Sequence, residues 1–394
     1  MNNTELETSR AYQICVLLVA GTALALAGID LVLPAVPALP GELDTSEAMA
    51  QIVIAAFVFG VALGLLVFGS LGARFPRRKV LVFALLAYSL FSCLCALAEN
   101  IHALVALRFF QGLMSAAPTV FAPVIINALF EQSTATRVLG MLGSVESLVP
   151  AAAPLLGVWL LAIGDWQTSF WVIAGLTLVL ALGIAYLGSH IPDGSRAESG
   201  GSYWRLLRSG VYLRYALSQA LVLGGLLVFV FAAPAVIVHT MDGELMHFII
   251  MQMVGVGFFI LGANLSASFV NRWGTEPVLM SGTLLAGLGA LLLFVYSVFG
   301  DNDPARLVYI FPLMNFGLGI RGPVGFLRAI IAGAGDDDRA SSLLFLAITI
   351  LSAGGTALLA PFIEQGLFAL CLATLVIQFM AIVCLLLLPK LDQA

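Results

Sequence analysis

Three ionisable side chains stand inside long apolar runs of this sequence: Asp30, Arg108 and Glu146. A charge surrounded by hydrocarbon is expensive, so such residues normally face a protein interior or a water-filled cavity and have a polar partner. Glu146 lies near the middle of its run, and a glutamate side chain is too short to reach either end. A carboxylate at this depth is costly when ionised, which predicts that Glu146 carries, or helps to carry, a proton.

Arg108 and Asp30 are predicted to be neighbours. Arg108 lies about six residues, roughly 10 Å at 1.5 Å per residue, from the end of its run, and Asp30 closes the first run at a similar depth. Each is costly to bury alone, and an ion pair would keep Asp30 ionised, making it a poorer proton carrier than Glu146. Two alternatives stay open: Arg108 extends to the lipid headgroups, or Asp30 simply faces water.

Other polar residues extend this candidate site. Gln111 follows Arg108 by about one helical turn. Arg321 is embedded in a later apolar run, where it would contact an anionic substrate, pair with a carboxylate, or lie near the inner interface. Further candidates for a cavity wall are Gln219, Gln252, Asn264 and Asn127.

Catalytic and metal-binding motifs are absent from the sequence. It contains no Gly-x-Ser-x-Gly, no His-Glu-x-x-His and no Walker phosphate loop. The cysteines lie in apolar runs, as small hydrophobic residues do: Cys15, Cys93, Cys95, Cys371 and Cys384. We therefore expect no enzyme, no metal, no cofactor and no nucleic-acid partner.

Composition sets the environment of these residues. Of 394 residues, 61% are hydrophobic and only 10% are charged, whereas an ordinary soluble domain has about 25% charged residues. A water-soluble fold cannot hide so much apolar surface, and the continuous runs favour helices over a membrane barrel. The sequence predicts an all-α membrane protein with twelve transmembrane helices at about 11–33, 48–70, 79–98, 102–129, 138–162, 166–188, 211–239, 246–270, 277–299, 305–331, 341–363 and 366–388.

The distribution of Lys and Arg predicts the orientation. Of the 17 cationic residues, only Arg306 falls in an outside loop, while Arg108 and Arg321 fall within spans. The others gather in inside loops and termini, which predicts that both termini are cytoplasmic. The polar N-terminus leads straight into the first span, so no separate signal peptide is expected.

A polar stretch at about 189–210 separates two related halves. Residues 64–81 align without a gap on residues 262–279, and each segment covers the loop after the second helix of its half. Such repetition is typical of transporters built from two bundles. The predicted domains are an N-terminal six-helix bundle at 1–190, a cytoplasmic linker at 191–210 and a C-terminal six-helix bundle at 211–394.

The loop between spans two and three reads Gly69-Ser-Leu-Gly-Ala-Arg-Phe-Pro-Arg-Arg-Lys79. It resembles the major facilitator superfamily signature G-x-L-a-D-R-x-G-R-[RK]. The glycine permits close helix approach, and the cations can bind helix C-termini or a carboxylate on the neighbouring half. Ala73 and Pro76 replace the Asp and Gly of the family, which removes that Asp from any charge relay. The matching residues are Gly69, Leu71, Arg74, Arg77 and Arg78.

Three further motifs resemble those of the Bcr/CflA branch of twelve-helix drug–proton antiporters. They are Asp30-x-x-x-Pro34-x-x-Pro37 after span one, Arg108-x-x-Gln111-Gly112 in span four, and Pro150-x-x-x-Pro154-Leu-Leu-Gly157 in span five. The two prolines of the motif in span five should bend that helix, and its small residues should let a neighbouring helix pack close.

The resemblance implies the major facilitator fold, with two related six-helix bundles that work by alternating access in the inner membrane. It implies proton-coupled efflux of drugs or small amphipathic metabolites by a monomer, whose partners are the substrate, protons and the lipid bilayer. A proton-coupled uptake symporter or facilitator for a metabolite shares the fold and is the alternative.

Overall fold

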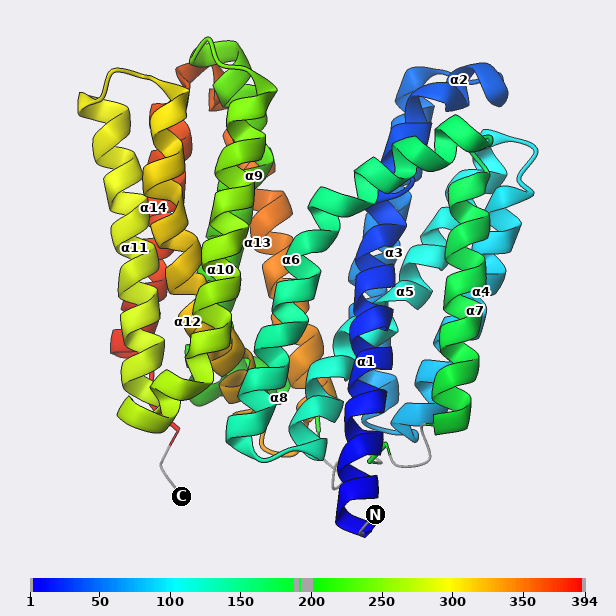
Figure 1. The fold of residues 1–394 in the computed structure, drawn as a ribbon, viewed down its shortest axis with the longest axis horizontal. Helices are drawn as coiled ribbons and strands as arrows, with labels where there is room; N and C mark the ends of the chain where they lie inside the picture. The colour runs from blue at the N-terminus through cyan, green and yellow to red at the C-terminus, as the bar shows by residue number, and fades with distance from the viewer. Residues whose placement is uncertain (1–2, 188–190, 193–200, 392–394) are drawn as a thin grey trace. The chain divides into compact units, whose positions relative to one another are not determined.

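A computed structural model of the chain describes residues 3–187, 191–192 and 201–391. Long helices dominate this part of the chain, which contains no strand (Figure 1). The helices are α1 (Asn3–Asp30), η1 (Leu33–Ala38), α2 (Leu39–Glu42), α3 (Glu47–Gly72), α4 (Arg77–Ala96), α5 (Ile101–Leu129), α6 (Gln132–Ile163), α7 (Thr168–Leu187), α8 (Tyr203–Arg208), α9 (Gly210–Thr240), α10 (Leu245–Trp273), α11 (Thr275–Phe299), η3 (Pro304–Arg306), α12 (Leu307–Ile331), α13 (Asp337–Leu359), η4 (Ala360–Gln365) and α14 (Leu367–Leu387).

The predicted number of spans is confirmed. Within the described ranges, 11 helices are long and apolar enough to cross a membrane, and the bent helix α6 brings the number to 12. The two parts of α6, Gln132–Pro150 and Ala152–Ile163, meet at 44°. Proline removes a backbone donor and its ring clashes with the preceding turn, so a bend next to Pro150 is the expected distortion.

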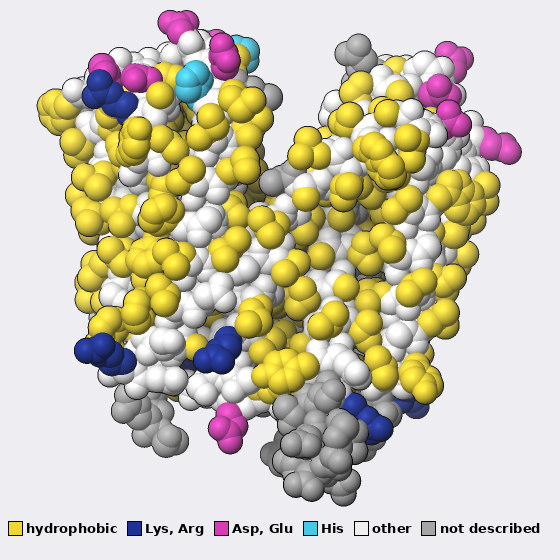
Figure 2. All heavy atoms as spheres, in the orientation of Figure 1, with side chains coloured by type: hydrophobic (Ala, Val, Ile, Leu, Met, Phe, Trp, Pro, Cys, Tyr) yellow, Lys and Arg dark blue, Asp and Glu magenta, His cyan; other side chains and the backbone are white. Residues whose placement is uncertain are grey.

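The surface has the character of a protein surrounded by lipid. Hydrophobic side chains cover the sides of the helices, and most charged side chains gather at their ends (Figure 2). Large apolar residues are exposed to a degree that water would penalise, such as Leu155 at 73% and Tyr309 at 82%. Helices satisfy their own backbone polar groups, so they can present such faces to hydrocarbon. The chain is therefore a multi-pass membrane protein.

Two compact units are distinguished by their internal contacts. The first comprises Met1–Leu129, Val145–Gly201 and Gly335–Ser342, and the second comprises Phe130–Ser144, Ser202–Ala334 and Leu343–Ala394. Each unit holds most of one predicted half, but α6 and α13 each contribute to both. The predicted linker at 191–210 lies partly outside the described residues, and its described end contains α8. The division into two six-helix bundles stays a prediction.

In both units, glycines allow two helices to pack with their backbones in close contact. In the first unit, a Cβ atom at Gly112 of α5 would collide with the carbonyl oxygen of Phe57 on α3. In the second, a Cβ atom at Gly319 of α12 would collide with the carbonyl oxygen of Phe259 on α10. Only glycine permits such close approach of two helix backbones, as small residues do at many membrane helix interfaces. This similarity is what the internal repeat leads us to expect.

Candidate functional site

Arg108 is the centre of a buried polar network in the first unit. Its side chain is completely buried on α5. Nη1 donates to the Gly28 carbonyl of α1 at 2.9 Å and to Gln111 Oε1 at 2.8 Å, and Nε donates to the Val53 carbonyl of α3 at 3.4 Å. Gln111 Nε2 in turn donates to Ser92 Oγ of α4 at 2.7 Å. Four helices therefore meet around one guanidinium group.

Aromatic rings complete the surroundings of Arg108. Its Cζ atom lies 4.2 Å from the centroid of the Phe57 ring and 5.6 Å from that of Phe170. A desolvated cation over an aromatic face gains about 2 kcal/mol. Among the guanidinium nitrogens, Nη2 has no hydrogen-bond partner in the protein. The side chain is held inside the unit, so the alternative of an arginine reaching for the headgroups is wrong.

The predicted ion pair between Arg108 and Asp30 is also wrong for this structure. Asp30 ends α1 and is half-buried, but the ion pairs between described residues do not join it to Arg108. Helix α1 reaches Arg108 through the Gly28 carbonyl, one of the last four carbonyls of a helix, which have no partner within it. A side chain at position 28 would collide with the Tyr88 hydroxyl, so glycine allows this approach. Arg108 therefore does not keep Asp30 ionised. The expectation that an ion pair makes Asp30 a poorer proton carrier than Glu146 no longer applies.

Glu146 lies near the middle of α6 and is half-buried. The Thr22 hydroxyl of α1 lies beside its carboxylate, and that hydroxyl donates its one hydrogen to the Val19 carbonyl at 3.0 Å. The ion pairs found in the described part of the chain do not include Glu146. The carboxylate thus meets a neutral hydroxyl rather than a cation, which suits a group that changes its charge.

The signature loop contacts the first turn of α13, within the first unit. Arg77 is buried and donates to Asp338 through two parallel bonds, Nε to Oδ1 at 2.8 Å and Nη2 to Oδ2 at 3.0 Å. A Cβ atom at Gly72 would lie 2.8 Å from the carboxyl carbon of Asp338, so glycine makes room for this pair. With Ala73 in place of the family's Asp, the carboxylate facing the loop cation comes from Asp338. Sequence reasoning missed both Asp338 and Gly72, although the acidic run at 336–338 was a visible signal.

The other signature residues are distributed around this pair. Arg78 donates to the Ala185 carbonyl in the last turn of α7, which is the favourable interaction of a cation with a helix C-terminus. Gly69 is buried, Leu71 is half-buried and Arg74 is exposed. Arg77 and Arg78, both at the start of α4, therefore hold the signature loop through side-chain hydrogen bonds.

The proline motif of α6 packs against the turn that follows Asp30. A Cβ atom at Gly157 would collide with the Leu31 carbonyl and lie 3.1 Å from ring atoms of Pro34. Pro34 stands in the first turn of η1, where a missing N–H group does no harm. The close packing predicted for residues 150–157 is therefore found at Gly157, while Pro150 and Pro154 accompany the bend.

Arg321 is completely buried near the middle of α12, so it does not lie at the inner interface. Nη1 donates to the Ser218 carbonyl of α9 at 2.6 Å, and Nη2 donates to the Ser218 hydroxyl at 3.1 Å. The ion pairs between described residues do not include Arg321. Of the three predicted roles, contact with an anion is the one left open.

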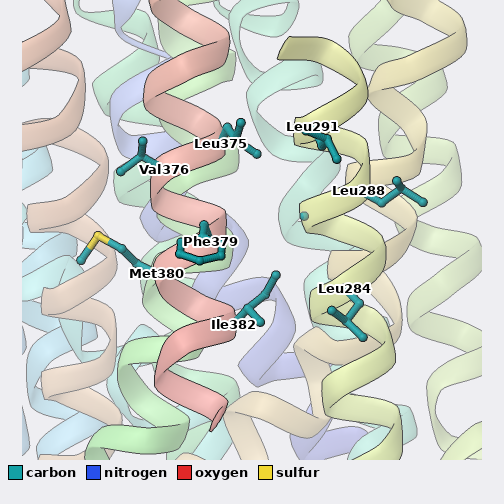
Figure 3. A pocket seen from close by; sticks show the side chains of 9 residues that line it. Leu284, Leu288, Leu291, Leu375, Val376, Phe379, Met380 and Ile382 are labelled. Carbon is teal, nitrogen blue, oxygen red and sulfur yellow. The ribbon is translucent and has the colours of Figure 1, made fainter. Parts of the chain in front are cut away.

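An apolar pocket lies between α11 and α14 (Figure 3). Several of its side chains are strongly exposed, including Phe379 at 61%, as expected of a groove filled by hydrocarbon. Clusters of His, Cys, Asp and Glu able to hold a metal ion are not found in the described ranges. The pocket is lined by Leu284, Gly287, Leu288, Leu291, Leu375, Val376, Phe379, Met380 and Ile382.

The helix number, the glycine-packed units and the buried charges define the architecture of a polytopic secondary transporter. The model of the Major Facilitator Superfamily matches residues 18–358, and the chain belongs to this family. The predicted membership is thereby confirmed, and the protein is a membrane transporter.

Similar proteins include two bacterial resistance proteins. The Bicyclomycin resistance protein homolog of Haemophilus influenzae is 24% identical over 277 residues, which cover 68% of this chain and 69% of that protein. The Chloramphenicol resistance protein of Pseudomonas aeruginosa is 27% identical over 326 residues, which cover 79% and 76%. The structure of the proton:xylose symporter XylE matches with a TM-score of 0.75 at 14% identity, covering 96% of this chain and 95% of that one. At this identity, the likeness to XylE concerns the fold alone.

Proposed function

We propose that this transporter exports drugs or small amphipathic metabolites in exchange for protons, by alternating access. The names of the two similar resistance proteins refer to bicyclomycin and chloramphenicol, which favours export of small molecules over uptake. The proposal includes the inner membrane as location, a monomer as the working unit, and both termini in the cytoplasm.

The proposal rests mainly on the position and surroundings of Glu146. Its half-buried carboxylate stands in the middle of a membrane-spanning helix, with a hydroxyl and no cation beside it. The Thr22 hydroxyl donates its hydrogen to the Val19 carbonyl and can accept from a carboxylic acid, so it suits the protonated state of Glu146. A carboxylate at this depth is costly when ionised, unless water or a cationic substrate reaches it.

Exchange follows if proton and substrate compete for Glu146. Contact with the more alkaline cytoplasm removes the proton, and a cationic or hydrogen-bonding substrate then replaces it. Contact with the more acidic outside restores the proton and releases the substrate. Asp30 is the competing proton site, because no ion pair to Arg108 holds its charge.

Inverted membrane vesicles test the proposal with labelled chloramphenicol as the probe. Under an acid-inside pH gradient, the wild type should accumulate the probe and lose it when an uncoupler is added. Glu146→Gln keeps the shape of the side chain but removes its titration, so it should exchange the probe across the membrane yet fail to accumulate it. Asp30→Asn is the matched control and should still accumulate it.

Two results would contradict this assignment. Full accumulation by Glu146→Gln, together with loss in Asp30→Asn, would move the proton site to α1. Proton-driven accumulation in right-side-out vesicles would instead identify an uptake symporter, the alternative function.

The proposed topology has its own test. Reporter fusions after residue 392 and within residues 193–201 should both be active on the cytoplasmic side, because the cationic loops favour that side. A periplasmic signal from either fusion would overturn the orientation.

A further inference from the structure

The second unit contains a buried arginine without a counter-charge. Arg321 has two hydrogen bonds, both to Ser218 of α9, and its Nε atom has no hydrogen-bond partner among the described residues. Desolvation strongly disfavours a guanidinium in hydrocarbon unless an anion or a full set of acceptors compensates it. One neutral residue does not supply that compensation.

Gln219 places an unpaired amide beside this guanidinium. It is completely buried, and neither Oε1 nor Nε2 has a hydrogen-bond partner in the protein. A Cβ atom at Gly325 would collide with Gln219 Oε1 and lie 3.1 Å from Arg321 Nη2. The ends of both side chains therefore lie next to the backbone of Gly325. On α11, a Cβ atom at Gly282 would lie 2.7 Å from Arg321 Cβ, so this helix closes the other side.

The two side chains together indicate a ligand. Buried polar groups in native proteins are nearly always hydrogen-bonded, and the exceptions cluster where a ligand or ion belongs. Here both the guanidinium group of Arg321 and the amide group of Gln219 have atoms without a hydrogen-bond partner among the described residues, and both side chains are 0% exposed. A positive charge that lacks both a carboxylate and a ring contact among the described residues requires an anion rather than another neutral group.

We propose that Arg321 and Gln219 bind a small monovalent anion within the second unit. The donors are the Nε–H group of Arg321 and the NH₂ group of Gln219 after a half-turn of its amide, while the Ser218 hydroxyl donates to the Tyr215 carbonyl at 3.2 Å. Both side chains are completely buried, which favours an ion as small as a halide or a single carboxylate group. The anion is a free halide or the carboxylate of a transported molecule, which share this chemistry. The site does not depend on the direction of transport or on the proton carrier.

Thermal unfolding of the purified, full-length protein in detergent tests the site. Sodium gluconate is replaced by sodium chloride, bromide or acetate at constant ionic strength, with acetate standing for a substrate carboxylate. A ligand that binds only the folded state raises its stability by mass action, so the Tm should rise with the anion concentration and saturate. A halide response identifies a free ion, whereas a response to acetate alone identifies a carboxylate, and both support the site.

Variants show whether the response belongs to these residues. Arg321→Gln should abolish the saturable rise in Tm. Gln219→Leu keeps the charge and should shift the half-saturating concentration upward by about tenfold, the effect of about 1.4 kcal/mol of lost binding energy. Gln252→Leu on α10 is the matched control, because this half-buried amide also has an unpaired Oε1, and it should leave the response unchanged.

Three results would overturn the proposal. They are a Tm that is independent of all three anions, a saturable rise that survives in Arg321→Gln, and a half-saturating concentration that Gln252→Leu raises as much as Gln219→Leu does. If Arg321→Gln does not fold, the difference between the two glutamine variants decides the question.

Discussion

Arg108 and Arg321 are both completely buried arginines on glycine-packed helices, yet their surroundings differ. Arg108 donates to three acceptors from three helices and stacks on Phe57. Arg321 donates only to Ser218 and lies beside an amide with no partner. The number of partners, and not burial itself, separates a guanidinium that organises its helices from one that is available to a ligand.

The same reasoning distinguishes the acids of the first unit. Asp338 is fully engaged by Arg77 through two parallel hydrogen bonds, so the opposite charge compensates its own. Glu146 has only a hydroxyl beside it. A paired acid therefore fixes structure, whereas an acid without a cation is free to change its protonation state.

The largest loss of stability is expected when the ion pair between Arg77 and Asp338 is broken. Asp338→Asn removes the carboxylate that forms the ion pair with the buried Arg77, and breaking a buried pair costs about 3–5 kcal/mol in the free energy of unfolding. Unfolding in a denaturing detergent, followed by tryptophan fluorescence, measures this loss. The exposed pair between Arg306 and Asp301 provides the control, since Asp301→Asn should change nothing measurable. Equal effects at both sites would mean that burial does not determine the value of these pairs.

Removing each arginine tests the comparison directly. Arg108→Ala should abolish transport while the protein stays in the membrane, and should cost about 2–4 kcal/mol from three hydrogen bonds and two cation–π contacts. Arg321→Ala loses two hydrogen bonds and no ring contact, so it should cost only about 1 kcal/mol in sodium gluconate, without halide or acetate. The same unfolding assay in gluconate compares the two variants. Equal losses would show that the two environments are energetically alike.

The glycine contacts test whether the units differ only in their polar sites. Gly112→Ala and Gly319→Ala each force a Cβ atom into a neighbouring carbonyl oxygen, and overpacking of this kind costs about 1–3 kcal/mol. The two losses should agree within the error of the unfolding measurement. Gly257→Ala is the control, because nothing lies within 4 Å of its Cβ position. A large difference between Gly112→Ala and Gly319→Ala would mean that the two units also differ in how tightly their helix backbones pack.

The fold was largely predictable because the bilayer imposes a simple rule. Each span needs a run of about 20 apolar residues, and these runs gave the correct number of helices. The bend of α6 was predictable from Pro150 and Pro154, since proline cannot complete the helical hydrogen-bond pattern. The length of the first span was not predicted, because η1 and α2 continue it to Glu42.

The polar contacts were only partly predictable, because they depend on how helices are rotated against one another. Gln111 is close to Arg108 because the two lie one turn apart on the same helix, which the sequence states directly. The partner of Arg77 is 261 residues away, and the acidic run at 336–338 does not by itself say which cation it meets. Asp30 failed as a partner of Arg108 because the free carbonyls of the helix end competed with its carboxylate.

The smallest expected effect is also the most diagnostic, because its sign should depend on the anion. Gln111→Leu removes an acceptor from Arg108 and a donor from Ser92, so it should cost about 1–2 kcal/mol in any salt. Gln219→Leu removes an amide that has no protein partner. Replacing an unpaired buried polar group by an apolar one of similar shape is neutral or stabilising, so this variant should match or exceed the wild type in gluconate.

In a chloride concentration that saturates the wild type, Gln219→Leu should fall below it, because the variant binds the anion less tightly. Gln111→Leu should stay below the wild type by the same margin in both salts. Parallel unfolding curves in gluconate and chloride measure all four values. If Gln219→Leu is as destabilised in gluconate as Gln111→Leu, its amide has a role inside the protein, and the contrast between the two buried arginines no longer holds.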